Sequence, residues 1–111
     1  MRSRGPCREI TARSFAVERV IDGDTFVVVY DGEPTSVRLA GIDAPEPREP
    51  GGAASTAALK AMIRGRQVTL EFPGPRKRDH FGRLLCRVWC GGVDVNRAML
   101  DGGHATETGR R

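Results

Sequence analysis

Two Asp-Gly pairs, Asp22-Gly23 and Asp31-Gly32, constrain the fold of this chain most strongly. Asp-Gly is one of the dipeptides that favour tight hairpin turns. The pairs separate three runs rich in β-branched and aromatic residues, FAVERVI, TFVVVY and TSVRLAGI, within residues 15–42. This pattern predicts an antiparallel meander of three strands.

The segment after Pro50, GGAASTAALKAMIRG, changes from strand-forming to helix-forming residues. Its middle is rich in strong helix formers, and Gly65 stands where a helix would end, so we expect a helix of about three turns. Spacing predicts that its apolar face toward the sheet contains Ala54, Ala57, Ala58, Met62 and Ile63.

Two further strands and a short helix are expected in the second half. QVTLEF at residues 67–72 alternates with a period of two, and RLLCRVWCGGVDV predicts a strand that turns at Gly91-Gly92. A short helix should run from near Asn96 to Gly102-Gly103. Three strands, a helix, two strands and a C-terminal helix indicate a mainly β, α+β fold: a five-stranded Greek-key barrel of the OB type.

At 111 residues the chain has room for one domain, which we place at residues 14–105. We expect residues 1–13 to form a flexible basic arm and residues 106–111 a disordered tail. No stretch is apolar enough for a membrane span, so we expect a soluble protein without a membrane partner, cytoplasmic if the sequence is complete. Cys86 and Cys90 would lie about 13 Å apart on a strand, too far for a disulfide, so reduced thiols are expected.

The formal charge is +4, and most of the 18 basic residues are arginine. The planar guanidinium group matches the geometry of phosphate oxygens. A polyanionic partner is therefore favoured, although a charge of this size is weak support alone.

Against this positive charge, the acids Asp22, Asp24, Asp43 and Glu46 crowd into one short stretch. Solvated turn residues would explain Asp22 and Asp24. A local EF-hand loop is excluded, because Phe26 stands where a third ligand is needed. A site assembled across strands remains: the hairpin register would bring Asp24 and Asp43 to one end of the barrel, where calcium or magnesium relieves their repulsion. Glu46, three residues beyond Asp43, is then placed as a general base.

The motifs VIDGDT, VRLAGIDAPE and DHFGR, followed by GGVDVNRAMLDGGHA, resemble the staphylococcal nuclease (thermonuclease) family in order and spacing. The resemblance runs from about Phe15 to Ala105. It implies an OB-type barrel and a calcium-dependent nuclease that hydrolyses phosphodiester bonds of DNA and RNA and leaves 3′-phosphates.

The resemblance also implies roles for single residues. Asp24 and Asp43 would be carboxylate ligands of Ca²⁺, the backbone carbonyl of Ala44 would be a further ligand, and Glu46 would activate the attacking water. Asp22 would be a nearby acid outside the ligand set.

Arg38 and Arg83 would clamp the phosphate in the same comparison. His80 and Phe81 stand where the family's best-known member has a Lys-Tyr pair, so we expect both to contact substrate, and the Phe81 ring can stack on a sugar or base.

Two alternatives to an enzyme remain: an OB module that binds nucleic acid or a protein without cleaving, and a purely structural domain whose basic segments are solvated. A degenerate module should have lost acids or arginines. The presence of the whole set favours the nuclease.

Overall fold

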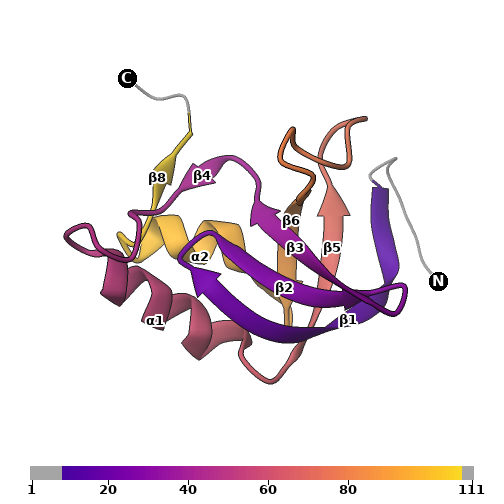
Figure 1. The fold of residues 1–111 in the computed structure, drawn as a ribbon, viewed down its shortest axis with the longest axis horizontal. Helices are drawn as coiled ribbons and strands as arrows, with labels where there is room; N and C mark the ends of the chain where they lie inside the picture. Colours follow the sequence, from indigo (N-terminus) through magenta and orange to yellow (C-terminus); the bar gives the residue numbers. More distant parts are fainter. Residues whose placement is uncertain (1–8, 109–111) are drawn as a thin grey trace.

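The structure is a computed structural model that describes residues 9–108, with side chains from residue 13 onward. The barrel strands are β1 (Glu9–Asp22), β2 (Thr25–Tyr30), β3 (Glu33–Leu39), β5 (Gln67–Phe72) and β6 (Leu84–Cys90). The short strands are β4 (Ile42–Asp43), β7 (Val93–Asp94) and β8 (Thr106–Glu107), and the helices are α1 (Gly52–Ile63) and α2 (Val95–Asp101). Figure 1 shows how they are arranged.

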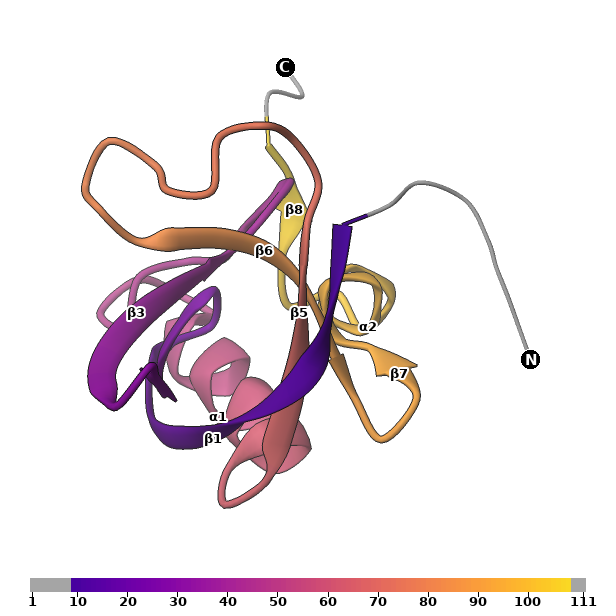
Figure 2. The same ribbon diagram turned by 90° about the vertical axis from the view of Figure 1, so that its right-hand side faces the viewer.

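The expected five-stranded barrel of the OB type is confirmed. Strands β3, β2, β1, β5 and β6 follow one another by antiparallel pairing, and parallel pairing of β3 with β6 closes the circle. The strongly curved β1 pairs with both β2 and β5, as Figures 1 and 2 show. Helix α1 lies in the connection between β3 and β5, and α2 follows β7.

The face that α1 buries matches the expected one in part: Ala58 and Met62 are partly buried against the core, and Ile63 is fully buried. Ser55, Leu59 and Ile63, spaced four residues apart, are fully buried, whereas Ala54 and Ala57 are exposed. Burial stabilises in proportion to apolar area, and an alanine offers little. The face that contains the two large aliphatic side chains, Leu59 and Ile63, is therefore the one that packs against the core.

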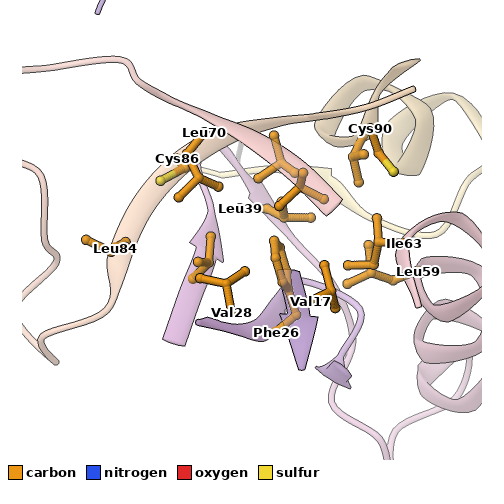
Figure 3. Packing of buried hydrophobic residues seen from close by; sticks show 14 of the residues in the cluster. Val17, Phe26, Val28, Leu39, Leu59, Ile63, Leu70, Leu84, Cys86 and Cys90 are labelled. Carbon is orange, nitrogen blue, oxygen red and sulfur yellow. The ribbon is translucent and has the colours of Figure 1, made fainter. Parts of the chain in front are cut away.

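A single apolar core fills the barrel and continues to α1. Phe26, Leu39 and Leu70 are fully buried strand residues, and Leu59 and Ile63 approach them from the helix (Figure 3). Each such side chain contributes roughly 1.5–3 kcal/mol relative to its exposed state. The core thus holds the helix against the end of the barrel.

Two strands of the described chain extend beyond the expected domain boundaries. β1 begins at Glu9, which pairs with Phe72, so the first strand enters the range expected as a flexible arm. Thr106 pairs with Asp43 in a two-stranded sheet of β4 and β8, within the range expected as a tail. Backbone pairing with an available strand edge explains both, since it requires no apolar side-chain pattern. Residues 1–8, with Cys7, and 109–111 lie outside the described part.

Cys86 and Cys90 are buried free thiols on β6, as expected. Burial raises the pKa of the Cys86 thiol to about 12. No helix of residues 9–108 is long and apolar enough to cross a membrane.

Candidate active site

The β1–β2 turn and the end of β3 bring the first candidate residues together. Thr25 is the register partner of Arg38, and the Leu39 N–H donates to the Asp24 carbonyl oxygen at 2.9 Å. Because Val37 and Leu39 point into the core, Arg38 projects from the opposite side of β3, as expected from the strand period. Asp24 and Arg38 therefore lie side by side at one end of the barrel.

Asp24 is held firmly and is almost completely buried, at 8% exposure. Its Oδ1 accepts a hydrogen bond from the Thr25 hydroxyl at 3.0 Å, and its Oδ2 accepts one from the Ala44 N–H at 2.9 Å. The second bond spans 20 residues of chain and fixes the segment after β4 against the β1–β2 turn.

Arg38 joins the two acids of the predicted metal site. Its Nη2 lies 3.4 Å from Asp24 Oδ2 and 2.5 Å from Asp43 Oδ1. Its Nη1 donates to the carbonyl oxygens of Leu39 and Ile42 at 2.6 and 2.7 Å. Both terminal nitrogens of this guanidinium are thus used by acceptors of the protein itself.

The donor set around Arg38 suits a hard cation. Two carboxylate oxygens, from Asp24 and Asp43, contact the same Nη2 atom of Arg38, so a cation that binds both carboxylates would take the place of this guanidinium nitrogen. Calcium and magnesium bind such carboxylates and complete their shells with backbone carbonyls and water. Residues 9–108 contain no cluster of three or more His, Cys, Asp or Glu side chains with metal-binding geometry. A cation here would therefore depend on two carboxylates with backbone and water oxygens.

Asp22 supports the turn from outside this pair. Its Oδ1 accepts a hydrogen bond from the Asp24 N–H at 3.1 Å. Burial, and then the neighbouring Asp24 carboxylate, raise the pKa of Asp22 above its ordinary value. The turn thus brings the carboxylates of Asp22 and Asp24 close together, and a nearby positive charge would reduce their repulsion.

Glu46 lies on the exposed loop between β4 and α1. Its N–H donates to Glu49 Oε1 at 2.8 Å, and its carboxylate forms no hydrogen bond or ion pair within residues 9–108. A Cβ atom on Gly52 would lie 1.9 Å from the Glu46 carbonyl oxygen, so the loop packs directly against the first residue of α1. Glu46 follows Asp43 by three residues, and its side chain is exposed.

Arg83 is held by a residue to which the sequence analysis gave no role. Asp79 Oδ2 accepts a hydrogen bond from Arg83 Nε at 2.9 Å. Burial alone would raise the pKa of Asp79, but hydrogen bonds from the Arg83 and Phe81 N–H groups and the Arg83 charge lower it below its ordinary value. The available signal was an Asp four residues before an Arg, with a turn-forming Gly82 between them.

Both arginines line one pocket of about 430 Å³, together with His80 and Phe81. The two rings are 4.9 Å apart between centroids, and the Arg83 guanidinium lies 5.1 Å from the centre of the Phe81 ring. Phe81 is 75% exposed, which is unusual for a large apolar side chain. The pocket thus combines positive charge with an open aromatic face, and Arg38 connects it to the acid pair.

Comparisons with known proteins show which sequences this chain resembles. Residues 36–110 match the family model described as staphylococcal nuclease homologue. A thermonuclease of Staphylococcus intermedius is 38% identical over 103 residues, which cover 87% of this chain and 61% of that relative. An uncharacterized endonuclease of Escherichia coli O157:H7 is 37% identical over 100 residues, which cover 89% of this chain and 61% of the relative. Endonuclease YncB of Bacillus subtilis is 34% identical over 95 residues, covering 80% and 45%.

The chain thus spans about three fifths of the length of the first two relatives. The family match covers β4, both helices, β5 and β6, and includes every predicted site residue except Asp24. The chain therefore belongs to the staphylococcal nuclease homologue family.

Proposed function

We propose that this protein is a calcium-dependent nuclease that hydrolyses phosphodiester bonds of DNA, RNA or both and leaves 3′-phosphates. One observation carries the proposal: two carboxylates converge on Arg38, and Arg38 shares a pocket with Arg83. Acids that suit a cation and guanidinium groups that suit a phosphate thus meet at one place. The names of the relatives, thermonuclease and endonuclease, support the same chemistry.

Asp24 and Asp43 would hold Ca²⁺ through carboxylate oxygens, and Ala44 would contribute its carbonyl oxygen. When bound, the cation supplies charge that stabilises the phosphate and lowers the pKa of water. Asp24 is oriented by the Thr25 hydroxyl and the Ala44 N–H, and to act as a ligand it would exchange the contact of its Oδ2 with Arg38 for the cation.

Glu46 would accept a proton from the attacking water as the water oxygen bonds to phosphorus. The bond from phosphorus to the 5′ oxygen breaks, and that oxygen takes up a proton to become the 5′-hydroxyl. Negative charge grows on the non-bridging oxygens in the transition state, where Arg83 would donate to them, joined by Arg38 Nη2 once Asp24 and Asp43 exchange it for the cation. Phe81 and His80 would position the neighbouring sugar or base.

The test is cleavage of heat-denatured DNA and of RNA by the purified chain, with Ca²⁺ and with excess chelator. Glu46→Gln removes the proton acceptor and keeps the shape, so we expect a rate loss of about 100-fold or more. Arg83→Lys keeps the charge but loses the planar fork, and kcat/KM should fall sharply. Undiminished kcat/KM in Arg83→Lys would contradict its assignment. A folded protein that binds DNA and does not cleave it would instead be a non-catalytic binding module.

A further inference from the structure

The two arginines of the pocket are held in different ways. Arg38 uses both terminal nitrogens on acceptors of the protein. Arg83 is anchored through Nε to Asp79, and neither of its terminal nitrogens has a hydrogen-bond acceptor among residues 9–108. Arg83 therefore presents the complete two-nitrogen edge of its guanidinium, the edge that binds phosphate oxygens in pairs.

Asp79 divides its two carboxylate oxygens between the loop and the side chain. Oδ1 accepts hydrogen bonds from the N–H groups of Phe81 and Arg83, at 3.0 and 2.9 Å. Oδ2 accepts the bond from Arg83 Nε at 2.9 Å. One oxygen thus shapes the turn, and the other orients the guanidinium.

Two backbone hydrogen bonds close the loop that carries Asp79 and Arg83. The Asp79 N–H donates to the Arg83 carbonyl oxygen at 2.8 Å, and the Gly82 N–H donates to the Asp79 carbonyl oxygen at 2.9 Å. Gly82 has φ of +83°, which favours glycine, and it lets the chain reverse within this short loop. The side chains of Asp79 and Arg83 are 17% and 29% exposed, so both are half-buried.

We propose that Asp79 is a positioning residue: it fixes Arg83 through Nε so that the terminal nitrogens of Arg83 face the pocket and bind a phosphate. This inference rests on the proposed function for its substrate, but its prediction concerns binding and not cleavage. Asp79 itself does not touch the phosphate, because its negative charge would repel it. Asp79 holds the Arg83 side chain in one conformation before the phosphate binds. Arg83 then loses less side-chain entropy on binding.

The direction in which nucleic-acid affinity changes when the Asp79 carboxylate is removed distinguishes a positioning role from an effect of net charge. Removing a carboxylate near a polyanion site strengthens binding if only net charge matters. Removing the Arg83 anchor weakens binding. Asp79→Asn keeps an oxygen for the two N–H groups of the turn and turns an amide toward Arg83 Nε, so it preserves the loop and removes the anchor.

The assay is fluorescence anisotropy with a labelled single-stranded oligonucleotide of about ten nucleotides, a length within the usual range for one OB fold. Excess chelator prevents cleavage. We expect Asp79→Asn to weaken binding by about 3- to 10-fold, and Arg83→Gln to weaken it by at least as much. In the Arg83→Gln background, Asp79→Asn should cause no further weakening, because its effect passes through Arg83.

Asp101→Asn is the matched control. Asp101 also pairs with an arginine four residues away, Arg97 at 3.1 Å, but on α2 and outside the pocket. It should leave the affinity unchanged or raise it slightly. Unfolding curves check that each variant is folded. NMR spectra of the ¹⁵N-labelled protein report the anchor directly: the Nε–H signal of Arg83 should be protected from exchange with water in the wild type and lost in Asp79→Asn.

Several results would overturn the proposal: wild-type protein that binds no oligonucleotide, Asp79→Asn that binds as tightly as wild type or tighter, or independent losses that multiply in the double variant. Cleavage is measured separately. A wild-type chain that never cleaves but shows the expected binding pattern would reject the nuclease function and retain the role of Asp79.

Discussion

Replacing Asn96 by alanine should destabilise the protein severely, because this buried side chain joins three segments. Asn96 is 2% exposed. Its Nδ2 donates to the carbonyl oxygens of Ala40 and Cys86 at 2.8 and 3.2 Å, and its Oδ1 accepts from the Val88 N–H at 2.9 Å. The side chain thus ties α2 to β6 and to the end of β3, just after Arg38.

The magnitude follows from the groups left without a partner. The Cys86 carbonyl keeps a hydrogen bond from the Ala40 N–H at 2.8 Å. The Ala40 carbonyl and the Val88 N–H lose their bonds to Asn96, and each unsatisfied buried group costs about 1–3 kcal/mol. We therefore expect the free energy of unfolding to fall by about 2–6 kcal/mol, a large part of the 5–15 kcal/mol typical of a domain.

Urea unfolding followed by circular dichroism measures this loss. Arg97→Ala, at the neighbouring exposed position, is the control and should change stability by no more than about 1 kcal/mol, since only a surface ion pair with Asp101 is lost. The m-value should be unchanged, which would show that the folded state itself has lost stability. A loss below 1 kcal/mol for Asn96→Ala would refute the reasoning.

Three further predictions concern the turn before β2 and the core. Gly23→Ala should destabilise the protein by about 1–3 kcal/mol, because the new Cβ would lie 1.9 Å from Ser55 Oγ; thermal unfolding checks this, and an unchanged Tm would contradict it. Asp22→Asn should raise the Tm of the calcium-free protein at neutral pH, because it keeps the oxygen that accepts from the Asp24 N–H and removes the repulsion between the two carboxylates. The gain in Tm should disappear as the pH falls through the raised pKa of Asp22, where the wild-type carboxyl becomes neutral. Cys86 should resist alkylation at pH 8 in the folded protein and react in urea, since burial raises its pKa to about 12; peptide mapping by mass spectrometry would show the difference, and equal modification in both states would contradict the burial of the thiol.

Patterns within one segment predicted the barrel well. The Asp-Gly turns and the alternation in residues 67–72 report the local conformation of the chain, and the β1–β2 and β2–β3 hairpins follow directly. The approach of Asp24 to Asp43 was also predictable, because the register of successive hairpins fixes which strand ends meet.

The parts that the sequence did not predict depend on contacts between distant segments. The face of α1 that is buried depends on how Leu59 and Ile63 fit the barrel core, and the spacing of the alanines does not reveal this fit. β8 pairs through its backbone with β4, and backbone pairing leaves no mark in a two-residue polar strand. The role of Asp79 was missed because the motif drew attention to Arg83 alone, whereas the carboxylate that orients it precedes the turn.

The most direct test of the central claim is mass spectrometry of the products formed from a defined single-stranded oligonucleotide with Ca²⁺. The account predicts paired fragments, one with a 3′-phosphate and the other with a 5′-hydroxyl, and no fragments when chelator replaces Ca²⁺. An intact oligonucleotide after incubation with the folded, oligonucleotide-binding wild-type chain would contradict the nuclease function. Fragments formed equally in chelator would contradict the role given to Asp24 and Asp43.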